Sequence, residues 1–167
     1  FFFARYVDWV FTTPLLLLDL ALLALPSTRG KLGLIGVLLG ADVYMIVTGL
    51  IAGLLTGSDK YVWFATSTIA FLFILYVLVR LLRETRSRGV AVRGLFRNLA
   101  TLTIVLWLCY PVVWLLGTEG TGILTIQVEV ILYAILDVLA KVGFGFLLLS
   151  NRAALSEPNA ASAQVVA

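Results

Sequence analysis

The chain has 167 residues, of which 62% are hydrophobic and only 13% are charged, and its net charge is +3. An ordinary soluble domain carries about 25% charged residues, so the composition excludes that class and predicts an integral membrane protein. The small net charge says little about partners.

Five apolar stretches are long enough to cross the hydrocarbon layer of a membrane, which takes about 20 residues of helix. They cover residues 2–25, 33–55, 61–82, 98–117 and 123–150. All five are predicted to be helices, because an open sheet leaves backbone polar groups unsatisfied in lipid. Their short connections favour one all-α transmembrane bundle over residues 1–152. A flexible cytoplasmic tail, 153–167, is expected to follow.

The basic residues predict an orientation. Nine of the twelve Lys and Arg residues lie at the same side of the five spans. The positive-inside rule makes that side cytoplasmic, including the loop 83–97 and the C-terminus of a plasma-membrane protein. A nucleic-acid patch is the alternative explanation for these arginines, and their position beside membrane spans disfavours it. The nine residues are Arg29, Lys31, Arg80, Arg83, Arg86, Arg88, Arg93, Arg97 and Arg152.

The first span contains Arg5, Asp8 and Asp19. Eleven residues make about three turns of helix, so the two aspartates share a face and lie roughly 16 Å apart along the axis. Arg5 is close enough to hold Asp8 ionised, whereas the leucines around Asp19 favour a protonated carboxyl. Two carboxylic acids with separate proton affinities suggest a proton relay.

Aromatic side chains gather in the fourth span. Trp107, Tyr110 and Trp114 recur on one face around Pro111, and Trp9 of the first span falls at a similar height. Such a stripe is either core, a lipid-facing belt, or the wall of an apolar ligand pocket. Pro111 removes a helix hydrogen bond and allows a hinge.

The fifth span contains Asp137 and, one turn later, Lys141. A charged amine inside a membrane helix is costly unless function requires it. Desolvation favours the neutral amine, which can attack an aldehyde and form a Schiff base. The alternative is a structural ion pair with Asp137.

The chain has a single cysteine, Cys109, and no histidine. An internal disulfide is therefore excluded, and a metal site is not expected.

Three segments resemble the third, sixth and seventh helices of microbial rhodopsins, close to the bacteriorhodopsin-like light-driven proton pumps. They are RYVDWVFTTPLLLLDLALL, LWLCYPVVWLLGTEG and ILDVLAKVGFG. The resemblance implies a seven-helix fold of which five spans are present, so two further N-terminal helices are expected as partners. It also implies a homo-oligomer in membrane lipid, without a nucleic-acid partner.

The resemblance further implies that Lys141 binds all-trans retinal as a protonated Schiff base. Asp8 would be the proton acceptor, hydrogen-bonded by Thr12, and Asp137 the second counter-ion carboxylate. Asp19 matches the cytoplasmic proton donor. The remaining roles are release of the proton by Glu119 and Glu129, and movement of Arg5 between acceptor and release group.

The same resemblance implies a retinal pocket. Its residues are Trp9, Thr13, Leu16, Asp42, Met45, Gly49, Ser67, Trp107, Tyr110 and Trp114. Thr13 is expected to face Asp42 near the ring end of retinal. Phe64 departs from the family, where many members have tryptophan.

The implied function is a light-driven outward proton pump, which is a transporter of protons and not an enzyme. Chloride pumps lack a carboxylate at the Asp8 position, and sensory members usually lack one at the Asp19 position. The alternatives are a photosensor that signals to a membrane partner, and a retinal-free bundle in which Lys141 is only ion-paired.

Overall fold

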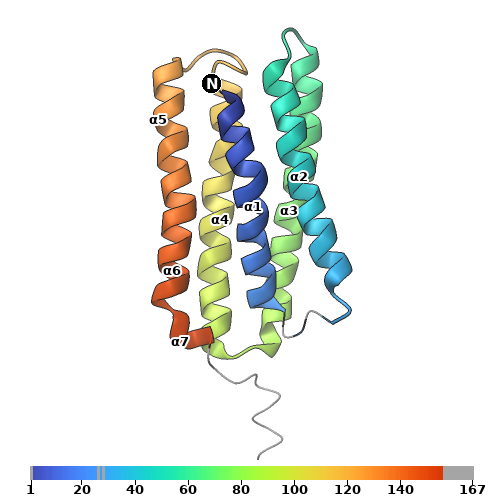
Figure 1. Cartoon of the computed structure of the whole chain (residues 1–167), viewed down its shortest axis with the longest axis vertical. Coiled ribbons are helices and arrows are strands. Elements are labelled where there is room, and N and C mark those ends of the chain that lie inside the picture. The colour runs from blue at the N-terminus through green and yellow to red at the C-terminus, as the bar shows by residue number, and fades with distance from the viewer. Residues whose placement is uncertain (1, 26, 28, 156–167) are drawn as a thin grey trace, which may run out of the picture.

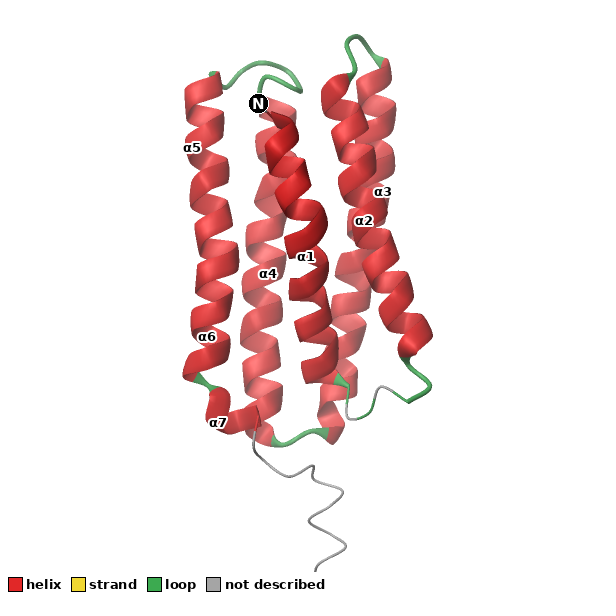
Figure 2. Cartoon of the chain, viewed as in Figure 1, coloured by secondary structure: helices red, strands yellow, loops and turns green. Residues whose placement is uncertain are grey.

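The computed structural model describes residues 2–25, 27 and 29–155. Within these ranges every regular element is helical, which confirms the all-α prediction (Figure 2). Five helical rods are long and apolar enough to cross a membrane, so the chain is an integral membrane protein. The rods lie roughly side by side along the long axis of the molecule (Figure 1).

The first three rods are uninterrupted helices. They are α1 (Phe2–Ala24), α2 (Leu32–Leu54) and α3 (Asp59–Glu84). Each lies within a few residues of its predicted span, because the hydrophobic stretch and the helix end at the same polar or glycine-containing connections. The α1 helix continues through Pro14.

The fourth rod, α4 (Val90–Leu116), begins eight residues before the predicted start at residue 98. The predicted loop 83–97 is therefore wrong, and only a 3₁₀ turn, η1 (Thr85–Ser87), and two further residues separate α3 from α4. The first turns of α4 bury Val92 and Phe96 but expose Arg93 and Arg97. An amphipathic helix end of this kind is too polar for a hydropathy window, although its buried face is apolar.

The fifth rod consists of three consecutive segments. They are α5 (Ile126–Asp137), the π-helical η2 (Val138–Gly143) and α6 (Phe144–Ser150). The hydroxyl of Thr125 caps the start of α5 by accepting a bond from the amide of Val128. The short α7 (Arg152–Leu155) follows. Residues 153–155 are therefore helical and not part of a flexible tail, and the predicted tail residues 156–167 lie outside the described part of the chain.

Two groups of buried side chains hold the rods together. One consists mainly of aliphatic residues and phenylalanines, including Leu17, Leu78 and Phe96. The other is smaller and rich in aromatic rings, including Tyr6, Trp9 and Tyr133. Members of both clusters form the wall of the same cavity, which locates the candidate site.

Candidate functional site

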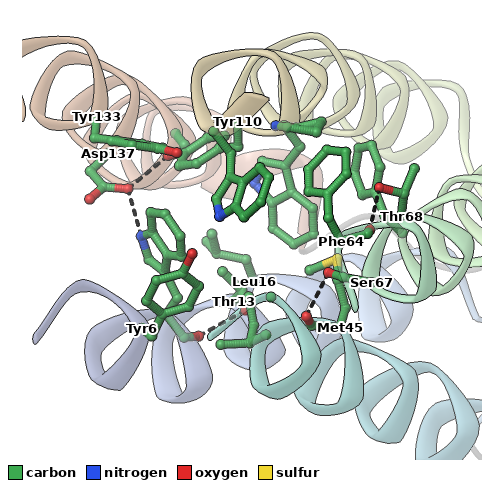
Figure 3. Close-up of a pocket in the computed structure, with 18 of the residues that line it drawn as sticks. Tyr6, Thr13, Leu16, Met45, Phe64, Ser67, Thr68, Tyr110, Tyr133 and Asp137 are labelled. Carbon is green, nitrogen blue, oxygen red and sulfur yellow. Dashed lines mark hydrogen bonds between the residues drawn. The ribbon is translucent and has the colours of Figure 1, made fainter. Parts of the chain in front are cut away.

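A cavity of about 100 Å³ lies between the helices, with walls from all five rods (Figure 3). Its surface is almost entirely apolar, and eight of its nineteen lining residues are aromatic. Nine residues of the predicted pocket line it together with Lys141: Trp9, Thr13, Leu16, Met45, Gly49, Ser67, Trp107, Tyr110 and Trp114. Asp42 does not line the cavity.

One end of the cavity is polar. The ammonium group of Lys141 forms an ion pair with the carboxylate of Asp8, and it lies 3.9 Å from Oδ1 of Asp137. The same Asp137 oxygen accepts hydrogen bonds from Nε1 of Trp9 at 3.0 Å and from the hydroxyl of Tyr110 at 2.7 Å (Figure 3). The amine is therefore held between two carboxylates, one of which is fixed by two donors.

Lys141 lies in the π-helical segment η2. A π turn has a wider hydrogen-bonding ring than an α turn and often marks a functional site. It also changes the angular position of the residues beyond it. Lys141 in this segment forms an ion pair with Asp8 of α1 and lies near Asp137 of its own rod.

Asp42 lies in α2 behind the cavity wall and is fully buried, with 0% of its surface exposed. The hydroxyl of Thr13 lies 2.7 Å from Oδ2 of Asp42 and 2.8 Å from the carbonyl of Trp9. Thr13 itself lines the cavity. Asp42 is therefore connected to the cavity through Thr13 and does not line the cavity itself.

Phe64 of α3 lines the cavity and stacks on Trp114 of α4, with ring centres 4.4 Å apart and planes 15° apart. Offset stacking of this kind stabilises two aromatic rings beyond their burial. Ser67 of α3 and Gly49 of α2 also line the cavity, and the Ser67 hydroxyl donates to the carbonyl of Met45 at 2.7 Å. An added Cβ at Gly49 would lie 3.3 Å from the Ser67 oxygen, so the glycine permits close packing of α2 and α3.

A second polar group lies beyond the cavity, near the α4–α5 connection. Arg5 forms an ion pair with Glu129 at 3.4 Å, and its guanidinium carbon lies 3.8 Å from the centre of the Tyr133 ring. The other oxygen of Glu129 accepts bonds from the amide and hydroxyl of Thr118, at 2.8 and 2.9 Å. Arg5 is therefore paired with Glu129, one of the two acids that the family resemblance assigns to proton release.

Glu119 belongs to this second polar group and is 7% exposed. The hydroxyl of Tyr6 donates to its Oε2 at 3.4 Å. Burial raises the pKa of Glu119 and so does the charge of Glu129, whereas Arg5 and the Tyr6 bond lower it; the net result is a pKa of about 7. The Glu119 carboxyl can therefore hold or give up a proton near neutral pH.

Asp8, Thr12 and Asp19 of α1 are predicted site residues that do not line the cavity. Asp8 is 45% exposed at its side chain, and Asp19 is also exposed. Leu17 and Leu20 are buried in the core, while Asp19 lies on the exposed face of the helix. The hydroxyl of Thr12 bonds the backbone carbonyl of Asp8 at 3.0 Å, and not its carboxylate.

Several cavity residues were not predicted from the sequence: Tyr6, Ile46, Thr68, Phe71, Pro111, Tyr133 and Ala140. A signal for Tyr133 was present, since Glu129, Tyr133, Asp137 and Lys141 are spaced by four and share one helix face. Tyr6 is likewise one turn before Trp9. Thr68 and Phe71 carry no comparable signal, because they lie in a uniformly apolar span.

The sequence profile of the family described as "Bacteriorhodopsin-like protein" matches residues 1–155. Archaerhodopsin-2 of Halobacterium sp. (strain aus-2) is 51% identical over 95% of this chain, and bacteriorhodopsin of Halobacterium salinarum is 49% identical over the same share. This chain covers 61% and 60% of the length of those two relatives.

The fold gives the same result. The crystal structure of thermophilic rhodopsin from Rubrobacter xylanophilus superposes with a TM-score of 0.91 at 56% identity, covering 93% of this chain and 69% of that one. A cyanorhodopsin structure from Calothrix sp. NIES-2098 gives 0.85 at 43% identity, covering 90% and 65%. The chain therefore belongs to the bacteriorhodopsin-like family of microbial rhodopsins.

Proposed function

We propose that the protein is a light-driven outward proton pump that carries all-trans retinal covalently on Lys141. The observation that carries the proposal is the position of the Lys141 amine, which lies at the end of an aromatic cavity between the carboxylates of Asp8 and Asp137. A structural ion pair would need one acid. It would not need an apolar cavity next to the amine.

The residues of the cavity fit retinal. An apolar polyene and ring suit a wall made of Trp9, Trp107 and Trp114, and an aldehyde end suits a lysine. The positive charge that such a linkage carries is matched by two acids within reach of the nitrogen. When bound, retinal supplies a light-driven isomerisation that changes the direction and basicity of that nitrogen.

The proton path follows from contacts of the chain itself. Asp8 touches the Lys141 nitrogen and is the acceptor, whereas Asp137 remains the fixed negative charge because Trp9 and Tyr110 both donate to it. Proton release is assigned to the outer acids Glu119 and Glu129, with Arg5 between them and the cavity. Asp19, on the same face of α1 as Asp8, is the donor that reloads the nitrogen from the other end.

Orientation is part of the proposal. The arginines of α3, η1 and the start of α4 lie at the end of the bundle opposite to Glu119 (Figure 1). The positive-inside rule makes that arginine-rich end cytoplasmic in a plasma membrane. Release through Glu119 and Glu129 is then outward, which gives the direction of transport.

The test is light-driven proton movement in intact cells or oriented vesicles that contain the retinal-loaded protein. We expect acidification on the side of Glu119 under light, which a protonophore abolishes and Asp8→Asn removes. A coloured protein that bleaches and recovers without moving protons would overturn the pump and favour the photosensor. A protein that stays colourless with added retinal would overturn the retinal site itself.

A further inference from the structure

The α4–α5 connection, residues 117–125, is folded tightly against the end of α4. Its amides satisfy the last carbonyls of that helix: Thr121 N bonds Leu115 O and Leu124 N bonds Leu116 O, both at 2.8 Å. A turn within the connection is closed by Gly120 N and Gly122 N, which both bond Gly117 O, at 3.1 and 2.8 Å. The connection is therefore an ordered cap and not a loose loop.

Gly120 is required for this turn. A Cβ at this position would collide with the carbonyl of Leu115, which belongs to the backbone and cannot move aside. The turn leaves the carbonyl of Gly120 available to a partner from another helix.

That partner is Lys60. Its ammonium group donates a 2.6 Å hydrogen bond to the carbonyl of Gly120, and the hydroxyl of Tyr61 approaches the same oxygen at 3.4 Å. Lys60 lies in the first turn of α3, where the helix dipole disfavours a cation. Its charge is instead directed to the C-terminal end of α4, where a cation is favourable.

Glu119, the residue before Gly120, belongs to this cap, and its side chain is buried against α1 and α2. Its Oε1 has no hydrogen-bond partner among the described residues and lies 3.2 Å from the position of a Cβ on Gly53. The charged and titratable groups that face it come from two helices, α1 and α5: Arg5, Tyr6, Glu129 and Tyr133. Lys60 contacts the cap and not the carboxyl.

We propose that Lys60 is a positioning residue that clamps the 117–125 cap through the carbonyl of Gly120 and so keeps water away from the Glu119 carboxyl. The ammonium group of Lys60 holds the backbone carbonyl of Gly120, and the Glu119 carboxyl is affected only through its burial. The inference deepens the proposed function, on which its significance rests: in an outward pump, this clamp sets the pH range in which Glu119 can give up a proton.

The direction in which the pKa of Glu119 shifts when Lys60 is replaced shows whether Lys60 acts as a clamp or as a nearby charge. Loss of a positive charge near an acid raises its pKa, whereas entry of water to a buried acid lowers it. If Lys60 is a clamp, Lys60→Met should lower the pKa of Glu119 by about one unit. It should also speed hydrogen exchange at the amides of residues 120–122 by about tenfold, because the cap opens more often.

Both measurements are made in the dark on the purified protein, so they do not depend on pumping. The infrared carboxyl band of Glu119 is identified by its loss in Glu119→Gln and is followed from pH 4 to 9. Lys60→Arg keeps a charged donor at the same position and should behave as the parent. Gly120→Ala breaks the same contact from the other side and should lower the pKa as Lys60→Met does.

Lys31→Met is the matched control, because Lys31 is a half-exposed lysine that pairs with Glu84 at 3.7 Å at the opposite end of the bundle. It should leave the Glu119 titration and the exchange of the cap unchanged. An unchanged or raised pKa of Glu119 in Lys60→Met, or unchanged exchange at residues 120–122, would overturn the clamp. Failure of light-driven transport alone would overturn the pump and leave the clamp standing.

Discussion

The hydroxyl of Tyr110 donates a 2.7 Å hydrogen bond to Oδ1 of Asp137, the same oxygen that Nε1 of Trp9 reaches at 3.0 Å. Tyr110 belongs to α4, Trp9 to α1 and Asp137 to α5, so one carboxylate oxygen joins three helices. The ring of Tyr110 also packs edge-on against Trp9, with centres 5.2 Å apart. Hydrogen bonds to an ionised acceptor are stronger than those between neutral groups.

Tyr110→Phe should therefore destabilise the bundle and alter the site. Loss of a bond to a charged, half-buried group should cost about 2 kcal/mol of unfolding free energy. It should also shift the visible absorption of the retinal-loaded protein, because the charge of Asp137 is redistributed near the Lys141 nitrogen. Tyr44→Phe is the control, since Tyr44 is exposed and should change neither quantity. Identical stability and colour in the two variants would contradict the assigned hydrogen bond.

Lys141→Ala tests the covalent link. We expect complete loss of visible absorption after incubation with retinal, while far-ultraviolet circular dichroism remains that of a helical bundle. The fold should survive because Asp137 keeps its bonds from Trp9 and Tyr110, and because Lys141 lies in the wall of a cavity and not in the close-packed core. Lys31→Ala should keep its colour. A coloured Lys141→Ala protein, without any added amine surrogate, would disprove the attachment site.

The buried carboxyl of Glu119 makes stability depend on pH. Its pKa is about 7 in the folded protein against an ordinary value of 4.5, so the folded state binds more protons between these two values. The free energy of unfolding should then fall as the pH rises from 4.5 to 7, by up to about 3 kcal/mol from this group, and stay level beyond.

Glu119→Gln removes this titration and isolates its contribution. Thermal unfolding of the parent and Glu119→Gln is compared at several pH values, so that all other groups titrate in both proteins. The difference in stability between the two should shift in favour of Glu119→Gln as the pH rises. A difference that stays constant from pH 4.5 to 8 would show that Glu119 is not buried as a protonated acid.

The fold could be predicted from the sequence where hydrophobic length alone decides it. Spans α1 to α3 were located within a few residues, because apolar helices in lipid end where polar residues begin. The start of α4 could not, since Arg93 and Arg97 hide a buried face that becomes visible only when α4 is packed against its neighbours. Tertiary contacts, and not hydropathy, fix that boundary.

The same limit applies to the site: the residue spacing in the sequence predicted contacts within one helix but not contacts between helices. The spacing of Asp137 and Lys141 placed an acid beside the amine, but the contact of Lys141 with Asp8 depends on how α1 packs beside η2. The π turn at Lys141 has no simple residue signature, and so it was missed. Likewise the pairing of Arg5 with Glu129 joins residues 124 positions apart, which no local pattern predicts.

Asp19→Asn tests the proton donor and separates a pump from a sensor. Asp19 lies roughly 16 Å along α1 from Asp8, so its loss should leave colour and the outward transfer to Asp8 unchanged. Reloading of the Lys141 nitrogen should become about a hundredfold slower at pH 8, because protons must then arrive from solvent without a positioned acid. The slowed step should also depend steeply on pH, and azide, a small diffusible proton carrier, should restore its rate.

Flash photolysis of Asp19→Asn, Asp8→Asn and the parent decides the assignment. Asp8→Asn should shift the colour and stop transport, since the counter-ion and the acceptor are lost together. Asp59→Asn is the matched control: Asp59 is an exposed acid in the first turn of α3, at the opposite end of the bundle, and its loss should leave recovery at the parent rate. If Asp19→Asn also recovers at the parent rate with the parent's pH dependence, Asp19 is not the donor. The exposed carboxyl would then have no part in the proton path, and the photosensor would become the better interpretation of the site.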